Sequence, residues 1–133
     1  MAEENVESLR GMIDDFNAGG IDAALAHVHP ELTWHAPPEW LEKSVYTGHE
    51  GLRELAASWG QNFEEYRVDV EQVIDLGDGR ALALLHQRGR IKDSGAQVEQ
   101  AIAYIAEFQA GLVARVDVFF SWEAALEAAG LRE

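Results

Sequence analysis

The stretch YRVDVEQVIDLGDG, residues 66–79, decides the fold of this chain. Apolar residues alternate in it with charged ones, which is typical of a β-strand with one buried and one exposed face. The alternating apolar residues are Val68, Val70, Ile74 and Leu76. Three more strands are predicted after it, at about 80–92, 96–108 and 112–121, so the second half of the chain forms an antiparallel sheet.

Each turn between these strands ends in glycine, at Gly79, Gly95 and Gly111. A three-residue hairpin loop needs a left-handed residue at its end, and glycine adopts that conformation without steric cost. Loops of this kind predict which side chains share a face. A rival register, with two-residue loops at 78–79 and 110–111, shifts the pairing by one residue and remains an alternative.

The three-residue loops divide the side chains of the sheet into two sets. The larger and more apolar set, which we assign to the face under the helices, comprises Val68, Val70, Ile74, Leu82, Leu84, His86, Arg88, Val98, Gln100, Ile102, Tyr104, Ala106, Val116, Val118 and Phe120. The outward set comprises Arg67, Asp69, Ala83, Leu85, Gln87, Glu99, Ala101, Ala103, Ile105, Glu107, Arg115, Asp117 and Phe119.

The first half of the chain is mainly helical. Apolar residues at three- and four-residue steps predict a helix near 4–18 and a shorter one near 21–28, followed by a short strand at 31–36. Thr47-Gly-His-Glu50 has the form of a capping box, which predicts that a third helix begins there. A last amphipathic helix is predicted over 122–129. Helices on one face of a curved sheet make an α+β roll with room for a pocket.

Composition narrows the class of protein. With 133 residues the chain has the length of one domain, 1–133, and 47% hydrophobic residues can fill one core. The lack of cysteine excludes disulfides and thiolate metal sites and agrees with the cytoplasmic location that we expect. A net charge of −14 argues against nucleic acid and anionic membrane surfaces as partners. No apolar run approaches the roughly 20 residues that span a bilayer.

Four segments carry a resemblance to a known family. They read FNAGGIDAAL at 16–25, HPELTWHAP at 29–37, YTGHEGL at 46–52 and GLVARVDVFF at 111–120. With them the chain resembles the SnoaL-like group of the cystatin-like superfamily, which includes ketosteroid isomerase, limonene epoxide hydrolase and nuclear transport factor two. The resemblance covers nearly the whole chain. It implies an α+β cone: N-terminal helices packed on a curved antiparallel or mixed sheet around a pocket for a small hydrophobic molecule.

The resemblance also suggests catalytic residues. The acidic base that cyclases and epoxide hydrolases of the superfamily carry in the last strand corresponds to Val118, and the hydrolase Arg-x-Asp pair corresponds to Arg88-Gly-Arg90. The isomerase general base corresponds to His35 and its oxyanion donor to Tyr104. Isomerase- or cyclase-like proton transfer is therefore expected, with His35 as base and Tyr104 as donor. The alternative is a non-catalytic ligand-binding or dimerisation module of the same fold.

Other side chains are candidates for contact with the ligand. They are Trp34, Trp40, Trp59, His86, Arg88, Gln100, Val118 and Phe120. Each of them also has an ordinary structural explanation in core, lid or strand packing. No metal is expected, because His27 and His29 are two residues apart and diverge on a helix end, and no cofactor is expected.

A homodimer is expected through the outward face of the sheet. The predicted register leaves a strip of small and apolar side chains there, at Ala83, Leu85, Ala101, Ala103, Ile105 and Phe119. An exposed apolar patch of this kind usually marks an interface. The alternative is that the C-terminal helix covers part of this face and leaves a monomer.

Overall fold

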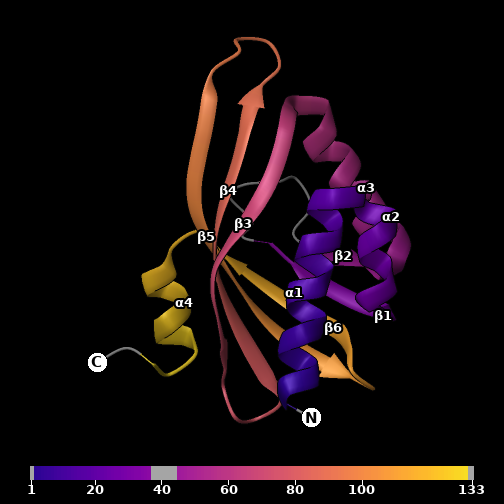
Figure 1. Ribbon diagram of the computed structural model, residues 1–133, viewed down its shortest axis with the longest axis vertical. Coiled ribbons are helices and arrows are strands. Elements are labelled where there is room, and N and C mark those ends of the chain that lie inside the picture. The colour runs from indigo at the N-terminus through magenta and orange to yellow at the C-terminus, as the bar shows by residue number, and fades with distance from the viewer. Residues whose placement is uncertain (1, 37–44, 132–133) are drawn as a thin grey trace.

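The computed structural model describes residues 2–36 and 45–131, which form helices on a six-stranded sheet (Figure 1). In chain order the elements are α1 (Ala2–Gly19), α2 (Ile21–Ala24), the 3-10 turn η1 (Leu25–His27), β1 (Val28–His35), β2 (Val45–Thr47), α3 (Gly48–Asn62), β3 (Phe63–Asp75), β4 (Arg80–Ile91), β5 (Gln97–Gln109), β6 (Leu112–Phe119) and α4 (Trp122–Ala128). The fold is α+β, as the sequence predicts. No helix in the described part is long and apolar enough to cross a membrane.

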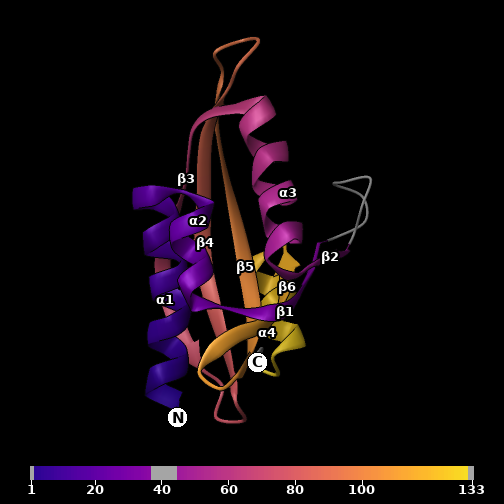
Figure 2. The same cartoon turned by 90° about the vertical axis from the view of Figure 1, so that its right-hand side faces the viewer.

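The sheet is mixed, with the strand order β2-β1-β6-β5-β4-β3. β1 runs parallel to β6, and all other neighbours are antiparallel. Helices α1, α2 and α3 cover one face and α4 covers the other (Figure 1). Seen from the side of the first three helices, α1 and α2 lie over one half of the sheet and α3 over the other half (Figure 2). We call the face under α1–α3 the cone face and the other the outward face.

Helix α1 is fixed to the free edge of the sheet by one side chain. The Asn17 amide donates to the Val68 carbonyl at 2.6 Å, and its oxygen accepts the Val68 N–H at 2.9 Å. Because β3 is an edge strand, both backbone groups would otherwise lack a partner strand. Asn17 therefore holds α1 in place and blocks edge-to-edge pairing at this point.

The two helix starts that follow a strand differ in their caps. α3 begins after Thr47, as predicted, but the Thr47 side chain makes no cap hydrogen bond, so the predicted capping box is wrong. Thr47 is still the last residue of β2 and pairs with Thr33 in the sheet. At α4, by contrast, the Ser121 hydroxyl accepts the Ala124 N–H at 3.2 Å, which is a standard N-cap.

The turns set the register of the sheet. At the first turn the Leu76 N–H donates to the Arg80 carbonyl at 3.0 Å, the closing pair that a three-residue loop predicts. The second turn has four loop residues, since the Ile91 N–H donates to the Ala96 carbonyl at 2.9 Å. The third has two, because Gln109 pairs directly with Leu112. Three-residue loops are therefore present at one turn only.

The four-residue loop inverts the predicted faces of β4. His86 pairs with Ala101 and Arg88 with Glu99, so these four side chains lie on the outward face. The cone face of β4 instead carries Ala81, Ala83, Leu85 and Gln87. On β5 and β6 the predicted directions are correct, because an irregularity between Glu107 and Phe108 restores the pairing phase.

The core has two parts, one on each face of the sheet. The larger part lies under α1–α3 and includes Tyr104, Val116 and Leu55, with Val118 and Phe120 packed against it. The smaller part lies under α4. It contains Leu82, Leu84, Ala103, Ile105 and Ala125, with Ile74, Leu76, Phe119, Trp122, Leu126 and Ala129 packed against them. Ile74, which we predicted on the cone face, belongs to this outer part because the β3 pairing shifts by one residue between Val70 and Gln72.

Helix α4 covers the strip that was predicted to be exposed. Ala103 and Ile105 are buried beneath it, and Ala83 and Leu85 lie on the cone face. The Trp122 indole N–H fastens the helix by donating to the Leu85 and Ile102 carbonyls at 3.0 and 2.9 Å. The exposed apolar strip is thus absent from the described residues, and the alternative, coverage by the C-terminal helix, is what the structure shows.

Candidate ligand-binding site

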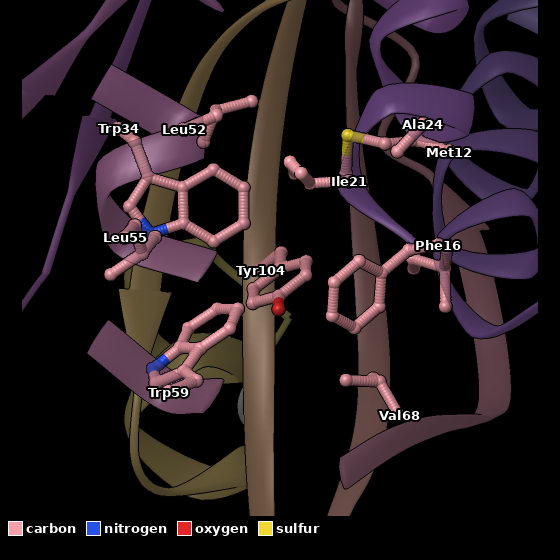
Figure 3. Close-up of a pocket in the computed structure, with 11 residues that line it drawn as sticks. Met12, Phe16, Ile21, Ala24, Trp34, Leu52, Leu55, Trp59, Val68 and Tyr104 are labelled. Carbon is pink, nitrogen blue, oxygen red and sulfur yellow. The ribbon is translucent and has the colours of Figure 1, made fainter. Parts of the chain in front are cut away.

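A cavity of about 40 Å³ lies between the first three helices and the sheet (Figure 3). Its lining is almost wholly apolar and comprises Met12, Ile13, Phe16, Ile21, Ala24, Trp34, Leu52, Leu55, Trp59, Val68 and Tyr104. α1, α2 and α3 direct the apolar stripes of their helices into this space, while β1, β3 and β5 supply the residues opposite. The helical spacing of the apolar residues is therefore what builds the site.

A second cavity of about 20 Å³ adjoins the first. The two share Trp34, Leu55, Trp59 and Tyr104, and the second adds Ala36, Tyr66, Gln87, Ile102, Val118 and Phe120. Their volumes are small compared with the roughly 150 Å³ of an apolar cavity that binds benzene. Side chains thus nearly fill the cone in this closed form.

Aromatic rings divide and cover this space. Trp34 meets Tyr104 edge to face, with ring centroids 5.0 Å apart. Trp59 stacks on Tyr66 at 5.0 Å, and Phe16 approaches both with its centroid 6.2 and 6.1 Å away. Phe16, Trp59 and Tyr66 are only partly buried, so they can move with less loss of packing than the fully buried residues of the lining.

A short relay of polar groups crosses the strands at the second cavity. The Tyr66 hydroxyl donates to Gln87 Oε1 at 2.6 Å, and Gln87 Nε2 donates to Gln100 Oε1 at 3.0 Å. Burial, and in second place the nearby Tyr104, raises the pKa of Tyr66; burial raises the pKa of Tyr104 as well. Both phenols are therefore neutral and keep their O–H donors at neutral pH.

Two further donors belong to residues that line the cavities. The Trp59 indole Nε1 is buried and has no hydrogen-bond partner within the described chain. The Tyr104 oxygen points into the space between Trp59 and Phe16 (Figure 3). A buried donor without a partner is unfavourable by about 1–3 kcal/mol, so an acceptor atom that reached the Trp59 N–H would be stabilised.

The described residues that line the cavities have no charged side chain. Among the described residues around the two cavities there is no Asp, Glu, His, Lys or Arg. Of these described residues, only Tyr66 and Tyr104 are ionisable, and both are neutral. These residues can bind and orient a molecule by packing and hydrogen bonds, but they include no general base.

His35, the predicted base, lies on the other side of the sheet from Tyr104. Its neighbour Trp34 pairs with Val116 and points into the cone, and His35 pairs with Asp117, which faces outward. Its Nε2 is buried without a hydrogen-bond partner in the described residues. The structure does not bring His35 and Tyr104 together, and the catalytic roles assigned to them stay predictions.

His86 and Arg88 also lie outside the cone, because the four-residue loop between β4 and β5 places them on the outward face. His86 packs edge to face on Trp122 of α4, with centroids 5.1 Å apart. Arg88 forms ion pairs with Asp69, at 2.6 Å, and with Glu99. The prediction that they face the helices is therefore wrong.

Of the other residues predicted to contact the ligand, some line the cavities and some do not. Trp34, Trp59, Val118 and Phe120 line the cavities. Gln100 is connected to the second cavity by its hydrogen bond with Gln87, which lines that cavity. Trp40 lies outside the described residues. Gln87 and Tyr66 were missed as site residues. A polar residue in the apolar run of β4 was the available signal for Gln87, but its face depended on the length of the next loop.

The two histidines considered as metal ligands, His27 and His29, each have a different hydrogen-bond partner. His27 Nε2 lies 2.7 Å from the Asp15 carboxylate, in a space that Gly11 leaves open on α1. His29 Nδ1 accepts the Glu31 N–H at 3.0 Å. Across 2–36 and 45–131, no three His, Cys, Asp or Glu side chains gather in a way that could hold a metal ion.

The fold and the sequence can be compared with known proteins. The model of the SnoaL-like domain matches residues 9–116. The chain belongs to the SnoaL-like family. No curated protein matches the sequence significantly.

Several solved structures share the fold at low identity. TerC, co-crystallised with polyporic acid, has a TM-score of 0.78 and 18% identity over 96% of this chain and 98% of that one. Bal32a, from a soil-derived mobile gene cassette, has a TM-score of 0.80 and 20% identity over 96% of each chain. A ketosteroid isomerase-like protein from Catenulispora acidiphila, in complex with trimethylamine, has a TM-score of 0.74 and 13% identity over 95% and 94%. These identities show the fold alone.

Proposed function

We propose that this SnoaL-like protein binds a small hydrophobic molecule inside the cone. The observation that carries the proposal is the pair of adjoining apolar cavities, which share the four side chains Trp34, Leu55, Trp59 and Tyr104. A lining of aromatic and aliphatic groups with a few polar atoms is typical of small-molecule sites.

Binding requires the closed form to open. The two cavities are too small for one benzene ring, so Phe16, Trp59 or Tyr66 must change rotamer to admit a molecule. The stack of Trp59 on Tyr66 lies between α3 and β3 and is partly exposed, so entry of a molecule at this stack would disturb the least packing. Side chains occupy discrete staggered rotamers, so a ring can move from one to another while the backbone stays in place.

The fold relatives support this function. TerC was crystallised with polyporic acid and the Catenulispora protein with trimethylamine, so the cone fold accommodates small molecules of different sizes. We take from them the class of function and not the identity of the ligand.

Filling the cavity tests the proposal. Ala24 is buried and lines the first cavity, so Ala24→Val places two extra carbon atoms in the binding space. We expect it to abolish the binding of small aromatic compounds in ligand-detected NMR titrations. Ala57→Val, on the exposed side of α3, is the matched control and should bind as the parent does. Unchanged binding in Ala24→Val would overturn the proposal. Native mass spectrometry of the purified protein would show any ligand that remains bound.

Proton transfer is not part of this proposal. His35 would have to reach the cone to act as a base on a molecule bound beside Tyr104, and β1 directs it away. The prediction can still be tested, because His35→Ala should abolish any isomerase or cyclase turnover while the protein stays folded. Unchanged turnover would leave His35 with a structural role.

We propose, second, that two copies associate through the outward face. The observation that favours it is charge balance: Arg67, Arg88, Arg90 and Arg115 pair there with Asp69, Glu99, Glu65 and Asp117, on a chain whose net charge is −14. Two copies of a negatively charged chain repel each other least where positive and negative side chains are balanced. In a two-fold contact the same surface of both copies meets, so an arginine of one copy can face a carboxylate of the other.

Light scattering at two salt concentrations tests the dimer. We expect about twice the chain mass of 14.7 kDa, and Arg88→Glu should shift the population to the monomer. Arg53→Glu, on α3 and away from this face, is the control. A mass near 14.7 kDa at both salt concentrations would contradict the dimer.

A further inference from the structure

One arginine links α2 and α3 on the solvent side of the first cavity. Arg53 Nε donates to Asp22 Oδ1 of α2 at 3.0 Å, and Arg53 Nη1 donates to Glu50 Oε1 of α3 at 2.7 Å. Asp22 follows Ile21 in the chain and Arg53 follows Leu52, and both Ile21 and Leu52 line the cavity. We call the contact between α2 and α3 the seam. The ion pair closes the outer side of the seam, and the cavity lies on its inner side.

The apolar part of the seam is small. Helix α2 has four residues, about one turn, so it presents few side chains to α3. Ile21 is only partly buried, and it lies opposite Leu52 across the cavity (Figure 3). Helices α1 and α2 lie over one half of the sheet and α3 over the other half (Figure 2). Separation of α2 from α3 therefore exposes little apolar surface, and an ion pair across the seam can change how often it opens.

The charges at the seam depend on Arg53. It is the only Lys or Arg in α2 and α3, whereas Asp22, Glu50 and Glu54 are acidic. One guanidinium binds Asp22 on one side of the seam and Glu50 on the other, so without it the two carboxylates would repel each other. These side chains are exposed, so each contact is weak by itself and is screened by salt.

We infer that Arg53 is an ionic strap that holds α2 against α3, and that the seam is a second opening of the cone whose use depends on ionic strength. The strap lies near the start of α3, and the stack of Trp59 on Tyr66 lies near its end, so the two openings are separate. This regulation rests on the proposed binding function, because it concerns access to the same site.

A single cysteine beneath the seam measures the opening. The chain has no cysteine, and Ala24 of α2 is 1% exposed and lines the first cavity. In an Ala24→Cys protein, the rate of alkylation by iodoacetamide, a small uncharged reagent, measures how often the thiol becomes accessible. Arg53→Gln in this background should raise the rate about fivefold at low salt, because an attraction across the seam is lost and a repulsion is added. An unchanged rate would overturn the inference.

The direction of the salt effect separates the strap from a general loss of stability. Added salt should raise the alkylation rate of the Ala24→Cys protein, because it weakens the attraction, and lower the rate after Arg53→Gln, because it screens the repulsion. A further Asp22→Asn substitution removes the repulsion and should return the rate to within about twofold of the Ala24→Cys protein. Salt effects of the same direction with and without Arg53 would contradict the strap.

Two controls complete the experiment. Arg10→Gln removes an exposed positive charge from α1 and should change the Ala24→Cys rate by less than about twofold. Ala103→Cys places the thiol in the core under α4, where Arg53→Gln should leave the rate unchanged. An equal rise at both cysteines would show general destabilisation and overturn the strap. These rates need no ligand, so the strap can fail while the proposed function still stands on the Ala24→Val titrations, and the reverse also holds.

Discussion

The two faces of the sheet are built from alternate residues of the same strands and yet have opposite chemistry. The cone face has aromatic and aliphatic side chains with a neutral relay, and no charge among its described lining residues. The outward face has arginine–carboxylate pairs over β3, β4 and β5 and an apolar strip beneath α4. The described lining of the cavities thus carries no charge, which makes the cavities suited to uncharged molecules.

A single loop residue decides which side chain belongs to which face. On β4, Leu85 and Gln87 enter the cone, and Leu84, His86 and Arg88 face outward, because the loop after β4 has four residues. Side chains alternate along a strand, so one residue more or less in the loop would exchange the two sets.

The largest expected effect compares two leucines on β4 that point to opposite faces. Leu85→Ala should lower the free energy of unfolding by about 3–4 kcal/mol, because Leu85 is fully buried in the larger core. Leu84→Ala should lower it by about 2 kcal/mol, because Leu84 belongs to the smaller core under α4. Urea unfolding measures both. A larger loss for Leu84→Ala would mean that the outer core dominates stability.

A smaller effect is expected at the junction of α1 and the sheet edge. Asn17→Ala removes two hydrogen bonds to Val68 and should lower the free energy of unfolding by about 1–2 kcal/mol. Asn62→Ala, whose exposed amide bonds only the Ser58 carbonyl, is the control and should change it by less than about 0.5 kcal/mol. Equal stability of the two variants would show that Asn17 does not hold the helix.

The two helix caps give the next comparison. Ser121→Ala should lower the free energy of unfolding by about 1 kcal/mol, because its hydroxyl accepts the Ala124 N–H. Thr47→Ala should change it by less than about 0.5 kcal/mol, because the Thr47 side chain makes no cap bond. Thermal and urea unfolding of both proteins would check this, and a large loss for Thr47→Ala would revive the capping box.

The smallest effect is expected on the outward face. Arg88→Ala should lower stability by less than about 1 kcal/mol, because Arg88 and its partners are partly exposed, and added salt should reduce the loss. Burial acts to raise the pKa of Asp69, but hydrogen bonds from Arg88 and Arg67 outweigh it and lower the pKa. The contribution of Asp69 is therefore complete above its ordinary pKa of about 4 and is lost as the pH falls through the lowered value. A loss in Arg88→Ala that is unchanged between pH 7 and pH 2 would contradict this.

Much of the fold follows from patterns in the sequence. The period-two alternation from Val68, the helical stripes and the glycine turns predict the last four strands and the helices, and the structure has them, although α4 lies on the outward face. The resemblance to the SnoaL-like family is confirmed by the family model. The face of β4 could not be predicted, because three- and four-residue loops that end in Gly95 look alike in sequence. The parallel contact of β1 with β6 is likewise absent from any local pattern.

The candidate site was predicted in part. Tyr104, Trp34 and Trp59 line the cavities because strand and helix periodicity place them correctly. The predicted face of His86 was wrong, because it depended on the length of the β4–β5 loop. Gln87 was assigned outward for the same reason, although its partners Tyr66 and Gln100 are what give the cone its polar end.

The central claim, that small molecules bind in the cone and not on the outward face, can be tested on the tryptophan indole signals. Trp34 and Trp59 line the cavities, and Trp122 lies across the sheet with its N–H on two backbone carbonyls. In a nitrogen–proton NMR titration of the labelled protein with acetophenone, assigned with Trp→Phe variants, we expect the Trp59 and Trp34 indole signals to shift and the Trp122 signal to stay. A shift of the Trp122 signal with the other two unchanged would contradict the account.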